Sequence, residues 1–123
     1  MALYDVVIPA RNEAATIEAV IRAARSATGV GEVFVIDDGS TDETPVVARE
    51  AGATVLPSTG RADKAQALAT GVRASAAAVL VFFDADILNP GPEHFEALAA
   101  PVVSGGYFMC CGLVDYGSLR SRM

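Results

Sequence analysis

Short apolar runs alternate with segments of helical periodicity along the chain. The runs that predict buried strands lie at 3–8, 33–36, 53–56 and 78–83. Helices are expected between these runs, where apolar residues recur every three or four positions, and a further short helix is expected over 93–100. Strands and helices that alternate in this way join through right-handed crossovers. The pattern therefore predicts an α/β fold with a doubly wound, mostly parallel sheet in a three-layer α/β/α arrangement.

Polar residues and prolines mark the expected ends of these elements. Pro9 is expected to end the first strand, and Asn12 is expected to cap the helix that follows it. Ser40 and Glu43 have capping-box spacing, which predicts that the second helix begins there. The run at 78–83 is apolar throughout, as is typical of a strand in the middle of a parallel sheet. The apolar face of the third helix is expected at Ala65, Leu68, Val72 and Ala76.

Length and composition indicate the number of domains and the class of binding partner. A chain of 123 residues with 52% hydrophobic residues allows one domain with an ordinary core. The net charge is −6 and the isoelectric point is near 4.6. This acidity disfavours nucleic acid or an anionic membrane as the main partner. A small anion held through a divalent cation is compatible with it.

The sequence also favours a reduced, cytoplasmic protein. The longest apolar run, 76–83, is far shorter than the roughly 20 residues that cross a bilayer, so no transmembrane segment is expected. The first residues lack the basic and apolar regions of a secretory signal. Cys110 and Cys111 are neighbours, so a structural disulfide between them is not expected, and two cysteines are too few for a zinc site.

Polar residues follow three predicted strands, at the ends where open α/β sheets bind ligands. Asp84 and Asp86 follow the run at 78–83, and in an extended segment both carboxylates face the same side. Carboxylates so close favour a cation beside them, and Mg²⁺ or Mn²⁺ would take further oxygens from a substrate phosphate. The other two strand ends carry 9–13 and 37–40. If the first and fourth strands are neighbours, all three segments meet in one crevice.

Each of these residues also has a simpler structural interpretation. An isolated Asp-x-Asp is common at solvated strand ends, and Asp37 begins an ordinary turn sequence. The turn explains the second acid, Asp38, less well, and a hydrogen bond to a base or ribose is the functional alternative. Glu13 would be favoured by a helix dipole. The dipole does not favour Lys64 at a helix start, which indicates either a nearby anion or a solvated side chain. His94, the only histidine, is more often a surface or packing residue than a base.

Neither a G-x-G-x-x-G nor a G-x-x-x-x-G-K-[ST] loop follows the first strand. The chain instead resembles the family 2 glycosyltransferases of GT-A fold, whose nucleotide-binding half is Rossmann-like. The matching stretches are VVIPARNE at 6–13, VIDDGSTD at 35–42 and VFFDAD at 81–86. Residues 64–68 resemble a degenerate form of the family's Gly-Lys-Gly-x-x-Leu, with Asp63 and Ala65 in the glycine places. The nearest branches are polyprenyl-phosphate sugar transferases and glucosyl-3-phosphoglycerate synthases.

The resemblance implies a nucleotide-diphosphate-sugar donor, linked to UDP or GDP, and a Mg or Mn cofactor that offsets charge on the leaving diphosphate. By analogy the metal ligand is Asp86. The donor-binding residues would be Pro9, Ala10, Arg11, Glu13, Asp37, Asp38, Lys64 and Asp84. Among them Asp38 would contact the base, Lys64 would lie near the base or diphosphate, and Asp84 would face the ribose or sugar.

The resemblance further implies a single, truncated domain over 1–123. Residues 1–90 would form the donor and metal core, and 91–123 would begin the acceptor-side segment. The remaining carboxylates, Glu93, Glu96 and Asp115, match no catalytic base of the family. The acceptor is unknown.

Two other functions compete with this interpretation. The first is a non-catalytic nucleotide-sugar-binding or assembly module that lacks the acceptor half. A homo-oligomer fits either function, because the edge of a fifth strand expected over 107–114 would invite pairing with a second copy. The second is a receiver-like signalling domain, which also clusters aspartates. In this chain the aspartate pair at 37–38 follows the second strand rather than the first, which counts against it.

Overall fold

The computed structural model describes residues 2–58 and 64–107. Within these residues four strands form one parallel sheet in the order β3-β2-β1-β4. The strands are β1 (Tyr4–Ala10), β2 (Val30–Asp37), β3 (Thr54–Pro57) and β4 (Leu80–Phe82). The helices are α1 (Ile17–Arg25), α2 (Thr44–Glu50), α3 (Lys64–Ala74) and α4 (Pro92–Val103).

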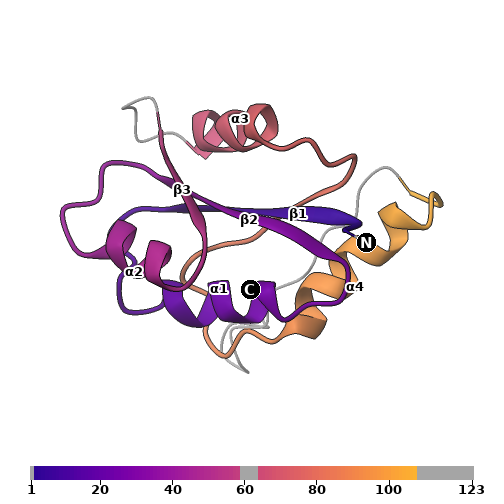
Figure 1. Ribbon diagram of the computed structural model, residues 1–123, viewed down its shortest axis with the longest axis horizontal. Helices are drawn as coiled ribbons and strands as arrows, with labels where there is room; N and C mark the ends of the chain where they lie inside the picture. Colours follow the sequence, from indigo (N-terminus) through magenta and orange to yellow (C-terminus); the bar gives the residue numbers. More distant parts are fainter. Residues whose placement is uncertain (1, 59–63, 108–123) are drawn as a thin grey trace, which may run out of the picture.

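The helices cover both faces of the sheet. Figure 1 shows α3 on one face, and α1, α2 and α4 on the other. Each strand of the series β1, β2 and β3 connects to the next parallel strand through a helix, as the alternating pattern requires. The predicted three-layer, doubly wound fold is confirmed. No helix within residues 2–58 and 64–107 combines the length and hydropathy needed to cross a membrane.

Alternation along β1 divides the apolar core into two parts. Tyr4, Val6 and Ile8 belong to a large cluster shared with α1, α2 and α4. Val7, between them, belongs to a second cluster with Phe34 and other residues beneath α3. Successive side chains of a strand point to opposite faces, so a strand covered by helices on both faces must be apolar at nearly every position. This is the physical reason for the largely apolar sequence of β1, in which Asp5 is the one charged residue.

The face of α3 that packs on the sheet differs from the predicted one. The buried positions are Ala67 and Gly71, whereas Val72 is 53% exposed. A Cβ atom added to Gly71 would lie 2.5 Å from Cγ1 of Val7. The helix therefore approaches β1 through its smallest residues, which the apolar periodicity of the sequence does not reveal.

The strand β4 is shorter and more peripheral than predicted. It covers three residues and pairs with β1, so it forms one edge of the sheet among the described residues. Phe82 is 43% exposed, which contradicts the expectation of a strand in the middle of the sheet. Of the strand expected over 107–114 only exposed Tyr107 is described. The two neighbouring cysteines and Asp115 also lie outside the described residues.

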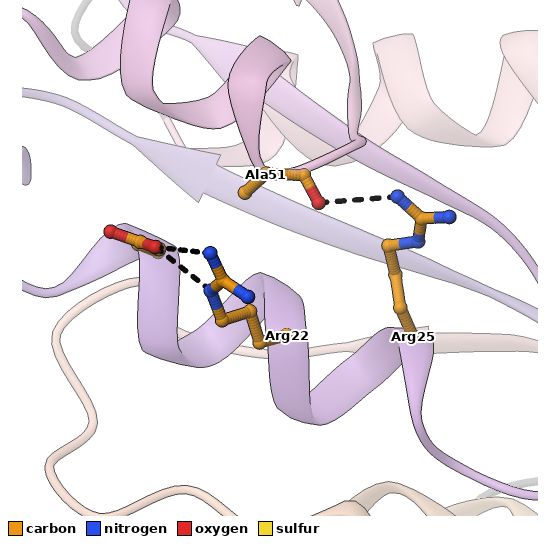
Figure 2. A network of polar contacts seen from close by, with 4 residues as sticks. Arg22, Arg25 and Ala51 are labelled. Carbon is orange, nitrogen blue, oxygen red and sulfur yellow. Dashed lines mark hydrogen bonds and ion pairs between the residues drawn. The ribbon is translucent and has the colours of Figure 1, made fainter.

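The helices α1 and α2 are joined by an arginine at the end of α1. Nη1 of Arg25 donates a hydrogen bond to the carbonyl oxygen of Ala51, at 3.2 Å, beside the C-terminus of α2 (Figure 2). A cation at this place complements the partial negative charge of the helix end. One turn earlier, Arg22 forms an exposed ion pair with Glu18, 2.7 Å between Nη2 and Oε2. Exposed pairs of this kind contribute a few tenths of a kcal/mol.

Candidate functional site

The carboxyl ends of three neighbouring strands form the candidate site. The strand β1 pairs with β2 on one side and with β4 on the other, and the chain order reverses between β1 and β4. The first and fourth strands are therefore neighbours, which is the condition under which the three polar segments meet. This reversal is where open α/β sheets bind ligands. Pro9 does not end β1 as expected, because the strand continues to Ala10, which pairs with Asp37.

Asn12 joins the loop after β1 to the loop after β2. Its backbone has a positive φ of 53°. Its side-chain oxygen accepts hydrogen bonds from the backbone N–H groups of Thr41 and Asp42, at 2.8 and 3.3 Å. Its own backbone N–H donates to Oγ of Ser40 at 2.9 Å. Asn12 therefore does not cap α1, and Ser40 does not begin a capping box, because both side chains link the two loops.

Thr44 forms the second link between these loops. Its side chain is fully buried, and its hydroxyl oxygen accepts a hydrogen bond from the backbone N–H of Glu13 at 2.8 Å. The same hydroxyl donates to a carboxylate oxygen of Asp42. The other carboxylate oxygen of Asp42 accepts from the N–H of Ala14 at 3.3 Å. The hydrogen bond from Thr44 is the largest of the contributions that lower the pKa of Asp42 below 3.8.

The segment after β4 is anchored at three points. The N–H of Phe83 donates to the carbonyl oxygen of Val7 at 3.1 Å, which extends the pairing of β4 with β1. The ring of Phe83 packs against Phe95 of α4, with ring centroids 4.2 Å apart. Ala85 is buried in the core between exposed Asp84 and Asp86. The two aspartates therefore share the solvent-facing side of a fixed segment.

The carboxyl group of Glu13 lies in the field of three other carboxylates. Its pKa is raised above 4.5, first by burial and then by the negative charge of Asp86, with smaller contributions from Asp42 and Asp84. A hydrogen bond between the side chains of Thr16 and Glu13 lowers this pKa and so partly opposes these effects. Carboxylates that disfavour one another's charge are stabilised by a cation. The electrostatics at these strand ends therefore favour a bound cation.

Oxygen donors make this region compatible with a hard divalent cation. Asp84 and Asp86 present carboxylates from one segment, and Glu13 lies within electrostatic reach of both. Among the described residues no group of three or more acidic, histidine or cysteine side chains could hold a metal by itself. Mg²⁺ and Mn²⁺ commonly use one or two carboxylates and complete their coordination with substrate phosphate and water. The residues present fit such a site.

The two aspartates that end β2 have different environments. A carboxylate oxygen of Asp37 accepts the N–H of Ser40 at 3.3 Å, the turn contact expected from the sequence. The N–H of Asp38 donates to the carbonyl oxygen of Ala10 at 2.9 Å, which holds this half-buried residue against the end of β1.

Ser58, beyond β3, has a buried hydroxyl oxygen without a hydrogen-bond partner among the described residues.

The structure thus brings most of the predicted donor-binding residues to one region. These residues are Pro9, Ala10, Arg11, Glu13, Asp37, Asp38 and Asp84, and the predicted metal ligand Asp86 lies with them. Lys64 begins α3, and its side chain lies outside the described part of the chain. Sequence reasoning missed Thr16 and Thr44, which hold the loops in place. Their only sequence signal is a surplus of helix-capping residue types near the starts of α1 and α2.

Comparison with known families agrees with this geometry. The family described as Glycosyl transferase family 2 matches residues 5–122. The chain therefore belongs to glycosyl transferase family 2.

Similar proteins include two curated glycosyltransferases. The chain is 38% identical to the glucosyl-3-phosphoglycerate synthase of Mycobacterium tuberculosis over 110 residues, which cover 82% of this chain and 34% of the relative. It is 37% identical to the 4,4'-diaponeurosporenoate glycosyltransferase of Staphylococcus aureus over 98 residues, which cover 76% of this chain and 26% of the relative. The chain thus spans about a third or less of the length of these relatives.

Solved structures give the same result for the fold. The glucosyl-3-phosphoglycerate synthase of Mycobacterium tuberculosis, solved with Mn²⁺, uridine diphosphate and glucosyl-3-phosphoglycerate, matches with a TM-score of 0.76 and 36% identity. The match covers 85% of this chain and 40% of that one. The same enzyme solved with Mg²⁺ and uridine diphosphate matches with a TM-score of 0.77.

Proposed function

We propose that this chain binds a nucleotide-diphosphate sugar and takes part in metal-dependent transfer of the sugar to an acceptor. The observation that carries the proposal is the position of Asp84 and Asp86. They follow the strand next to β1, at the reversal of strand order, and their charges reach Glu13 in the loop after β1. A UDP-linked donor is favoured over a GDP-linked one, because similar enzymes have been solved with uridine diphosphate.

We assign the donor-binding roles by position. Pro9, Ala10 and Arg11 would line the nucleotide pocket together with Glu13. Pro9 and Ala10 end β1, and the other two residues lie in the loop that directly follows it. Asp38 would contact the base from the end of β2. These positions lie on adjacent strand ends, which is the arrangement that a flat base beside a pyrophosphate requires.

The remaining roles concern the diphosphate and the sugar. Asp84 would face the ribose or sugar, Asp86 would ligate Mg²⁺ or Mn²⁺, and Lys64 would lie near the base or diphosphate. When bound, the cation offsets the negative charge that develops on the leaving diphosphate. The chain itself contributes fixed orientation, because buried Ala85 and partly buried Phe83 anchor the segment in the core on either side of Asp84.

The proposal divides the chain at about residue 90. Residues 1–90 would supply the donor and metal core, and 91–123, which include α4, would begin the acceptor side. A nucleotide-sugar-binding module without transfer activity is the second candidate, and the second assay below distinguishes the two. We also propose that the protein is located in the cytoplasm and that one copy of the chain pairs with a second.

Thermal unfolding with and without Mn²⁺ tests the binding function. A ligand at 100 times its dissociation constant stabilises a folded protein by about 2.7 kcal/mol, which raises the melting temperature of a small domain by several degrees. We expect UDP and UDP-glucose to give this shift only with Mn²⁺, and Asp86→Ala to abolish it. Glu93→Ala removes an exposed carboxylate on α4 and is the matched control. An equal shift without metal would contradict the role of Asp86.

A second assay separates enzyme from binding module. Radiolabelled UDP-glucose is incubated with the chain and Mn²⁺, with and without phosphoglycerate as a trial acceptor. Transfer or donor hydrolysis that is lost in Asp86→Ala establishes an enzyme. Binding without either reaction favours the module.

A further inference from the structure

We propose that Thr16 is a positioning residue for the metal-binding segment, an inference that rests on the proposed function. Thr16 occupies the N-cap position of α1, where a threonine hydroxyl ordinarily accepts a hydrogen bond from a backbone N–H of the first turn. Here the side chain makes no such capping bond. Its hydroxyl instead donates to the carbonyl oxygen of Ala85 at 2.8 Å, across 69 positions of sequence. The hydroxyl thus connects α1 to the segment after β4 in place of a cap on its own helix.

The acceptor of this hydrogen bond makes the contact specific to the metal-binding segment. The carbonyl of Ala85 belongs to the peptide unit that leads into Asp86, and a peptide unit is planar. A bond that fixes this oxygen therefore fixes the plane that contains the backbone nitrogen of Asp86. The methyl group of Ala85 is buried in the core, which anchors the residue at a second point. Together the two anchors set the direction in which the Asp86 side chain leaves the backbone.

The same hydroxyl also lies next to the loop after β1. Its oxygen is 3.5 Å from the carbonyl oxygen of Glu13, a longer contact than the one to Ala85. Thr16 is half-buried and so partly withdrawn from water. It therefore stands between the two loops that flank the reversal of strand order, where a diphosphate and its cation would lie. Groups behind a metal ligand orient it, and their removal typically lowers metal affinity 10- to 100-fold.

Two substitutions that each change one group of the Thr16 side chain test the proposal. Thr16→Val replaces the hydroxyl by a methyl group, and Thr16→Ser keeps the hydroxyl and removes the methyl group. UDP is titrated calorimetrically into each variant and into the unaltered chain, once with Mn²⁺ and once with EDTA. We expect Thr16→Val to lose about tenfold or more of the affinity for UDP in Mn²⁺, and to change the affinity in EDTA less than twofold. Thr16→Ser should remain within about threefold of the unaltered chain in both media.

A purely structural role would give a different result. Equal losses of UDP affinity in Mn²⁺ and in EDTA would overturn the proposal, and so would a Thr16→Val variant that keeps its gain from Mn²⁺. If Thr16→Val does not fold, Thr16→Ala is titrated instead, with the same two outcomes deciding. An unaltered chain whose UDP affinity does not depend on Mn²⁺ would refute the proposed function and this inference with it. A dependence on Mn²⁺ that survives in Thr16→Val would refute only the role of Thr16.

Discussion

Glu13 and Asp86 lie on loops at the ends of neighbouring strands, and the charge of Asp86 raises the pKa of Glu13 in addition to the effect of burial. The folded chain therefore holds the Glu13 proton more tightly than the unfolded chain does. A group of this kind lowers stability as pH rises through and above its ordinary value of 4.5. The relationship connects the stability of the fold to the cation that the site is proposed to hold.

Glu13→Gln should remove the dependence of both fold stability and cation binding on the charge of residue 13. Near neutral pH the variant should be slightly more stable than the unaltered chain. The difference should shrink as pH falls through 4.5 and vanish well below it, where the glutamate is protonated in both states. Denaturant unfolding at several pH values measures this. A cation near Asp86 would displace the Glu13 proton, so Mn²⁺-dependent UDP affinity should rise with pH in the unaltered chain and less steeply in Glu13→Gln. Parallel pH profiles for the two proteins would refute the coupling.

Gly71→Ala should destabilise the chain although alanine is the better helix former. The added Cβ would lie 2.5 Å from Cγ1 of Val7, which is fully buried in the centre of the sheet. Overpacking of this kind typically costs about 1–3 kcal/mol, more than the ~1 kcal/mol gained in helix propensity. The midpoint of urea unfolding reports the net change. Val72→Ala, at an exposed neighbouring position, should change stability by less than about 0.5 kcal/mol.

Gly52→Ala should be unfavourable for two separable reasons. The backbone of Gly52 has a φ of 101°, and an added Cβ would lie 1.3 Å from Nη1 of Arg25 (the residue shown in Figure 2). Backbone strain costs about 1–2 kcal/mol, and displacement of Arg25 removes its bond to Ala51. A double-mutant cycle with Arg25→Ala separates the two effects. If the cost of Gly52→Ala is unchanged without Arg25, the collision contributes nothing.

Asn12→Ala should loosen the link between the loops after β1 and β2. It removes the acceptor for the N–H groups of Thr41 and Asp42 and places an alanine at a φ of 53°. We expect a loss of about 1–3 kcal/mol in the free energy of unfolding, from the hydrogen bonds and the strained backbone together. Asn12→Gly relieves the strain alone and should lose less. Equal stability of both variants and the unaltered chain would show that the link is energetically unimportant.

The sequence was sufficient for the fold class, and most of the residues that it assigns to the site lie together at the strand ends. Largely apolar runs such as the one in β1 predict strands covered on both faces, and the polar residues after them predict chemistry at the strand ends. The packing of α3 was predicted wrongly, because it depends on close approach at Ala67 and Gly71 rather than on the count of large apolar residues. Close approach is a property of two elements, so one helix does not reveal it.

The polar contacts that hold the site were the hardest to predict. Asn12, Thr16 and Thr44 are residue types that cap helices, and their local spacing gives each of them that ordinary interpretation. In the structure each of them bonds to a segment 28 or more positions away in sequence, although Thr44 also keeps a local side-chain bond, to Asp42. Which of two available partners a hydroxyl takes is decided by the tertiary arrangement, and local sequence spacing does not contain it.

Calorimetric titration of the chain with UDP, with and without Mn²⁺, tests the central claim most directly. We predict measurable binding that is at least tenfold tighter with Mn²⁺, loss of this gain in Asp86→Ala, and its retention in the control Glu93→Ala. UDP binding that is the same with Mn²⁺ and with EDTA, or a gain that survives in Asp86→Ala, would contradict the assignment of a metal-dependent donor site to the ends of β1 and β4.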